Sequence, residues 1–146
     1  MLDTLRVRTR IKEVRKRLTI LDKNFKDIPE KEFTKNERVN AAAERHLQVA
    51  IQACIDIANH IVASLGIERP MKDTAEVFSS LGQEKVIPKR FVETMTKITG
   101  YRNVLVHDYL EVDRHITYEN IQKRLPDLSK FAKHIEEFLE KQEKKS

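Results

Sequence analysis

The chain has 146 residues, with 28 Lys and Arg against 23 Asp and Glu, and its formal net charge is +5. This length corresponds to one domain, and a hydrophobic content of 40% excludes a disordered chain. With 3 Gly and 4 Pro, the composition argues against an all-β sandwich or a glycine-rich phosphate-binding loop and favours long helices.

The first predicted helix covers residues 3–23 and is followed by a loop at residues 27–33. Apolar side chains recur in this helix at helical spacing, at Leu5, Ile11, Val14, Leu18 and Leu21. Thr34 to Glu37 form a capping-box pattern, which predicts the start of a second helix. That helix runs to Leu65, and Gly66 is its expected C-terminal stop.

The second helix carries a continuous apolar arc beside a polar stripe. The stripe spans roughly 80° of the helix circumference. Its members are Arg45, Gln48, Gln52, Asp56 and Asn59. Two interpretations stay open, a solvated helix edge or a half-buried polar cleft or subunit interface.

A short third helix is predicted to start at residues 73–76 and to be interrupted by Gly82, and Pro88 suits the first turn of a fourth helix that continues toward His107. A connection at residues 110–116 leads to a fifth helix, residues 117–141, which Pro126 should kink. The charged tail, residues 140–146, is expected to fray.

The predicted fold class is therefore all-α, an antiparallel bundle of about five helices in a single domain, residues 1–146. Residues 1–10 contain four charged side chains, so they do not form a secretion signal. The weakly polar stretch at residues 50–65 is shorter than the roughly 20 apolar residues of a membrane span. A single cysteine, Cys54, fits a reducing compartment, and we expect a soluble, cytoplasmic protein that does not contact a membrane.

The densest cluster of candidate functional residues is at residues 101–109. Arg102 supplies a permanent planar cation that can clamp a phosphate, and His107 can donate or accept a proton near neutral pH. These groups suit RNA cleavage without a metal ion. On an ideal helix the side chains of Arg102 and His107 point about 140° apart, whereas those of Arg102 and Tyr109 point in nearly the same direction. Asn103, four residues before His107, is placed to orient the imidazole. The spacing also fits surface residues at a helix C-terminus, where cations face the helix dipole.

The sequence RNVLVHDY, residues 102–109, matches R-x4-H-x-Y and resembles the signature of the HepT toxin branch of the HEPN superfamily. Residues 44–48 and 56–61 resemble the same branch. The resemblance implies an all-α HEPN fold that dimerises and places Arg102 and His107 of both subunits along a cleft at the dimer interface.

The same resemblance implies a metal-independent ribonuclease toxin without a cofactor, with RNA as substrate. Its partner would be an MntA-like nucleotidyltransferase antitoxin that silences it by transferring AMP from ATP to Tyr109. Asp56 and Asn59 would line the cleft or hold Arg102 in place, although simple interface packing explains them equally well. No metal site is predicted, because the four other histidines lack ligand spacing; they are His46, His60, His115 and His134.

Two other functions stay open. The chain could be a non-catalytic HEPN module that binds nucleotide and pairs with a minimal nucleotidyltransferase, or a purely structural helical scaffold. The sequence does not identify which RNA is cut.

Overall fold

The computed structural model describes residues 2–67, 74–107 and 113–145, and the side chains in these ranges except those of residues 74 and 104–107. The described residues form seven helices and no strand, which confirms the all-α class. The helices are α1 (Thr4–Asn24), α2 (Glu30–Lys35), α3 (Glu37–Ser64), α4 (Thr74–Gln83), α5 (Lys89–His107), α6 (Arg114–Lys123) and α7 (Leu125–Lys145).

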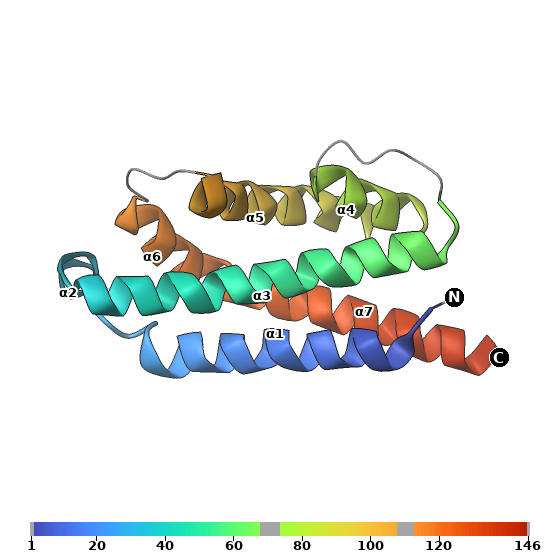
Figure 1. Cartoon of the computed structure of the whole chain (residues 1–146), viewed down its shortest axis with the longest axis horizontal. Coiled ribbons are helices and arrows are strands. Elements are labelled where there is room, and N and C mark those ends of the chain that lie inside the picture. Colours follow the sequence, from blue (N-terminus) through green and yellow to red (C-terminus); the bar gives the residue numbers. More distant parts are fainter. Residues whose placement is uncertain (1, 68–73, 108–112, 146) are drawn as a thin grey trace.

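Four long helices form an antiparallel bundle (Figure 1). Helix α3 lies at its centre and packs against α1 and α7 on one side and against α4 and α5 on the other. The core is continuous across these contacts, and Phe78 of α4 meets Phe131 of α7 edge to face with ring centroids 5.7 Å apart. This arrangement places the polar stripe of α3 between α1 and α5.

Helix α3 begins two residues later than the capping box predicts. Asn36 is the N-cap, because its side-chain oxygen accepts a hydrogen bond from the Val39 amide at 3.1 Å. The Thr34 hydroxyl instead donates to the Glu30 carbonyl inside α2. The predicted stop is confirmed, since Gly66 has a φ of 71°, in the left-handed region that glycine adopts without strain.

By length and composition alone, α3 could cross a membrane, contrary to the expectation from the sequence. However, 56% of its apolar window is buried inside the bundle, as in the core helix of a soluble protein. Many of the apolar side chains of α3 therefore pack against other helices of the same chain.

The loop predicted at residues 27–33 is wrong in its second half, where α2 begins at Glu30. This six-residue helix is too short to show a hydrophobic period. It forms because Phe33 is fully buried and packs against the ring of Tyr118 from α6, at a centroid distance of 5.3 Å. A tertiary contact therefore stabilises α2.

The single fifth helix predicted at residues 117–141 is also wrong, because two helices, α6 and α7, cover this region and α6 begins at Arg114. Pro126 does not kink a continuous helix. The break falls at Arg124, and the proline sits in the first turn of α7, where its missing N–H is not needed. The described part of the tail is helical, since α7 continues to Lys145.

Gly82 lies in the last turn of α4 and faces Val92 of α5. A Cβ atom at this position would lie 2.5 Å from Cγ2 of Val92. The glycine is therefore required by packing, whereas the sequence suggested an interruption of the helix. Helix α5 begins at Lys89, directly after Pro88, and buries Phe91, Met95 and Ile98 as predicted.

Candidate functional site

Arg102 extends from α5 toward α3 and is half-buried between them. Its guanidinium donates two hydrogen bonds to the same oxygen, Oε1 of Gln52, from Nε at 3.0 Å and from Nη2 at 2.6 Å. A planar guanidinium held along one edge cannot rotate freely. Gln52 therefore fixes the orientation of the predicted catalytic cation.

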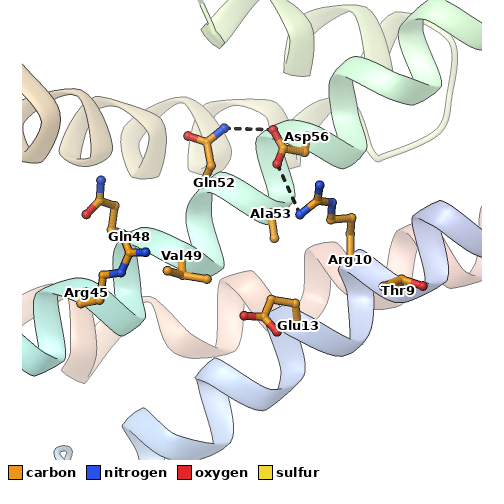
Figure 2. A pocket seen from close by; sticks show the side chains of 9 residues that line it. All are labelled: Thr9, Arg10, Glu13, Arg45, Gln48, Val49, Gln52, Ala53 and Asp56. Carbon is orange, nitrogen blue, oxygen red and sulfur yellow. Dashed lines mark hydrogen bonds and ion pairs between the residues drawn. The ribbon is translucent and has the colours of Figure 1, made fainter.

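Gln52 is itself oriented by Asp56, one helical turn further along α3. The amide Nε2 of Gln52 donates to Oδ1 of Asp56 at 3.0 Å, and the other carboxylate oxygen lies 3.9 Å from Nη1 of Arg10 on α1 (Figure 2). A carboxylate can only accept, so the amide nitrogen must face Asp56 and the amide oxygen must face Arg102. The result is a polar chain from α5 across α3 to α1.

The spacing of Asn103 predicts that it orients His107, whose side chain lies outside the described set. The side-chain oxygen of Asn103 accepts a hydrogen bond from Nη1 of Arg102 at 3.3 Å. Among the described contacts, Asn103 and Gln52 together engage three of the five N–H groups of the guanidinium. Asn103 therefore supports Arg102.

The residue before Arg102 anchors this part of α5 to α6. The Tyr101 hydroxyl lies 2.6 Å from Oγ1 of Thr117, and both side chains are buried. Burial raises the pKa of Tyr101 well above its usual range, while the hydrogen bond with Thr117 opposes this shift. Burial also raises the pKa of Glu44, against the opposing effects of Arg114 and of a hydrogen bond with Thr117. Tyr101 thus stays protonated and acts as a fixed internal contact.

The other predicted site residues lie apart from this polar chain or outside the described side chains. Asn59 is exposed, and its side chain forms no hydrogen bond with any described residue. The backbone of His107 ends α5, five residues after Arg102, and its side chain lies outside the described set. Tyr109 lies outside the described residues altogether.

A pocket of about 310 Å³ opens between α1 and α3, next to this polar chain (Figure 2). Four members of the polar stripe line the pocket, namely Arg45, Gln48, Gln52 and Asp56. Gln48, Gln52 and Asp56 are partly buried in this pocket, whereas Arg45 is exposed and Asn59 is not part of the pocket. The direct contact of Gln52 with Arg102 was not predicted, because the stripe indicated a polar surface but not which helix covers it.

Among the described residues, no three His, Cys, Asp or Glu side chains come together as metal ligands would. Two of the histidines have fixed partners, since Nε2 of His60 accepts from the Asp3 amide and Nδ1 of His46 accepts from Arg17. Burial and the neighbouring Arg17 both lower the pKa of His46. Cys54 is fully buried, and burial raises the pKa of its thiol, which makes it unreactive.

The chain is similar to proteins of known activity. The family described as ribonuclease HepT-like matches residues 10–135. The mRNA nuclease HepT of Shewanella oneidensis is 38% identical over 88 residues, which are 59% of this chain and 64% of that protein, so the match spans less than two thirds of its length. The tRNA nuclease HepT of Aphanizomenon flos-aquae is 26% identical over 117 residues, which are 80% of this chain and 79% of that protein.

Solved structures share the fold. The tri-AMPylated HEPN toxin of Shewanella oneidensis, in complex with an MNT antitoxin, superposes with a TM-score of 0.80 at 26% identity and covers 93% of this chain and 98% of its own. The cytosolic protein YutE of Bacillus subtilis superposes with a TM-score of 0.83 at 21% identity, over 97% of this chain and 93% of its own, which demonstrates a common fold. Because the family match covers most of the chain, the protein belongs to the HepT-like ribonuclease family.

Proposed function

We propose that the protein is a metal-independent endoribonuclease toxin that cleaves RNA with Arg102 and His107. Arg102 lies on α5, the helix that ends at His107, and two hydrogen bonds to Gln52 of α3 hold its guanidinium in place. This observation supports the proposal most directly. A cation fixed in advance stabilises developing negative charge without a reorganisation cost at the moment of reaction. The nuclease activity of the relatives supports the same assignment.

The chemistry uses the ribose 2′-hydroxyl of the substrate. A general base removes its proton, the 2′-oxygen attacks phosphorus, and the bond from phosphorus to the 5′-oxygen breaks as an acid protonates that oxygen. Arg102 binds the charged phosphate oxygens through the transition state, and His107 transfers the proton. In a homodimer, two Arg–His pairs along one cleft would supply both a base and an acid.

Control of this activity is the second part of the proposal. A nucleotidyltransferase antitoxin of the MntA type transfers AMP from ATP to Tyr109, which is seven residues after Arg102. The added phosphate carries negative charge that competes with RNA for the guanidinium. The AMPylated Shewanella toxin in complex with its MNT antitoxin supports this mode of regulation. Both partners would act in the cytoplasm.

Expression of the chain without its antitoxin tests the activity. The wild type should arrest growth and degrade RNA, and purified protein should cut RNA equally well with EDTA present. His107→Ala should abolish both effects, whereas Lys12→Ala, an exposed residue of α1, should leave them intact. Full toxicity of His107→Ala would refute the assigned chemistry. RNA left intact by the wild type at every concentration would favour the non-catalytic binding module.

Intact-mass measurement tests the regulation. Incubation with the antitoxin and ATP should add one or more AMP masses to the wild type and none to Tyr109→Phe. Tyr118→Phe, a change in a partly buried tyrosine of α6, should still be modified. Modification of Tyr109→Phe would assign the AMP to another residue.

A further inference from the structure

The face of α3 that carries the polar stripe continues toward the start of the helix, where it presents arginines. Arg38, Arg45 and Gln52 follow one another at intervals of seven residues on α3. Seven residues are almost two helical turns, so the three side chains point in nearly the same direction and lie about 10.5 Å apart along the helix axis. Gln52 holds the guanidinium of Arg102, so Arg38 and Arg45 form an arginine row that leads away from the proposed cleavage site.

The two side chains of the arginine row have no partner within the described part of the chain. Most arginines in that part form a hydrogen bond or an ion pair; Arg17, for example, donates to Glu13 at 3.0 Å. Arg38 and Arg45 are exposed and form neither kind of contact with any described residue. Their guanidiniums therefore keep all of their N–H donors for a ligand.

The acidic side chains near the arginine row point elsewhere or are already engaged. Glu37 and Glu44 each precede an arginine of the row by one residue, so they point about 100° away from it. Both line a separate pocket between α3 and the start of α6, together with Arg114. Glu13 and Asp56, on the other side, have partners on α1 and α3. The positive charge of the row is therefore not neutralised by neighbouring carboxylates.

The surface along the arginine row is open and does not favour one nucleobase. Ala41 and Ala42, between the two arginines, are small and exposed. The pocket between α1 and α3 opens beside Arg45, and Figure 2 shows Arg45 next to Gln48, which leaves α3 on the same side as Gln52. The carboxamide of Gln48 has both donors and an acceptor, so it can pair with any base. A strand that lies here is bound through its backbone.

We propose that the arginine row binds successive phosphates of the RNA strand that is cleaved at Arg102, independently of its bases. A planar guanidinium contacts a phosphate through two parallel N–H donors. One strand of a duplex carries a phosphate about every 3.4 Å of helix axis, so the interval of about 10.5 Å between arginines spans roughly three phosphates, and fewer in an extended single strand. Phosphate contacts position a nucleic acid without reading its sequence. This inference rests on the proposed function, because the RNA on the row is the one bound at Arg102.

The salt dependence of RNA binding tests the arginine row. Binding of a fluorescein-labelled dodecauridylate to the His107→Ala protein, which should not cleave it, is measured by fluorescence anisotropy at several salt concentrations. Each phosphate contact to a single strand contributes about 0.7 to the slope of log affinity against log salt concentration. Adding Arg38→Gln or Arg45→Gln should therefore make the slope about 0.7 less steep, and an oligoadenylate of equal length should be weakened by the same factor. Arg45→Lys keeps the charge and should retain most of the slope.

Arg90 provides the matched control. It is an exposed arginine without a hydrogen bond or ion pair to any described residue, and it lies at the opposite end of α5 from Arg102. Arg90→Gln removes the same charge at a distance from the row, so it should leave the slope unchanged. An equal reduction of the slope by Arg90→Gln, or an unchanged slope after both substitutions in the row, would overturn the proposal.

Cleavage by protein with His107 intact separates this inference from the proposed function. Arg45→Gln should raise KM for a long RNA more than it lowers kcat, as expected for loss of uniform substrate binding. Cleavage that neither substitution in the arginine row affects, with unchanged salt slopes, would overturn the row alone. The expected change in slope without any cutting by the wild type would overturn the ribonuclease assignment alone.

Discussion

Gln52 and Arg102, fifty residues apart in the chain, are joined by two hydrogen bonds that converge on one amide oxygen, at 3.0 and 2.6 Å. Because Asp56 holds the amide nitrogen of Gln52, the amide cannot flip and present that nitrogen to the guanidinium. The orientation of Arg102 is therefore determined by two residues of α3 that do not have to touch the substrate.

The first prediction concerns Arg102 itself. Arg102→Ala should lower kcat by about a hundredfold or more, because loss of one preorganised charge-stabilising group has effects of that order. Arg102→Lys should restore little activity, since a lysine ammonium cannot form the paired contact with Gln52 along a planar edge. Cleavage of a labelled RNA, with melting temperature as a folding check, measures both variants. Activity of the lysine variant near the wild-type level would show that only the charge matters.

Gln52→Leu tests the positioning role. The substitution keeps the side-chain size, removes the acceptor, and should reduce kcat and kcat/KM by similar factors of about ten to a hundred. KM should change little, because Gln52 holds the catalytic group and does not provide uniform substrate binding. Gln83→Leu on α4 is the control and should match the wild type. A rise in KM at constant kcat would make Gln52 a binding residue instead.

Tyr101→Phe should lower the free energy of unfolding by about 1–3 kcal/mol. The change removes the hydroxyl that lies 2.6 Å from the fully buried Thr117 and leaves a buried polar group with one partner fewer. Urea denaturation measures the loss. Removal of the hydroxyl from Tyr118, which is only partly buried, should have a smaller effect. Equal stability of the two variants would contradict the anchoring role of Tyr101.

The glycines of α4 and α5 should respond to alanine in opposite directions. Gly82→Ala places a Cβ 2.5 Å from Cγ2 of Val92 and should destabilise the protein by about 1–3 kcal/mol. Gly100→Ala meets no atom within 4 Å and should stabilise it by about 0.5–1 kcal/mol through higher helix propensity. Adding Val92→Ala to Gly82→Ala should recover part of the loss. Melting curves that rank the two alanine variants in the reverse order would be inconsistent with this packing.

His115 and Glu30 join α6 to α2 in a contact that depends on pH. The hydrogen bond with Glu30 is the main reason that the pKa of His115 is raised, and the nearby carboxylates add to the effect. A raised pKa means that the contact contributes its full stability below the unfolded pKa and loses it as the pH rises through the folded pKa. His115→Gln should therefore lower the melting temperature more at about pH 5.5 than at about pH 9. A difference that is the same at both pH values would exclude this titration.

The sequence predicts the long helices well because their apolar periods are local and sustained. It fails at α2, which depends on burial of Phe33 against α6, and at Arg124, where backbone geometry before Pro126 decides between a kink and a break. Within the site, the polar stripe was visible as a helical pattern. Its contact with Arg102 was not, because it depends on which face of α5 packs against α3.

The distance in sequence between Gln52 and Arg102 has a consequence during translation. The ribosome has already synthesised the sequences of α1 and α3 when it adds Arg102 to the chain. Polypeptides released before α5 would therefore lack the proposed cleavage centre, even with α1 and α3 complete. If the protein is a toxin that cleaves RNA, the cell that makes it is exposed to the nuclease activity only after the ribosome has translated most of the mRNA.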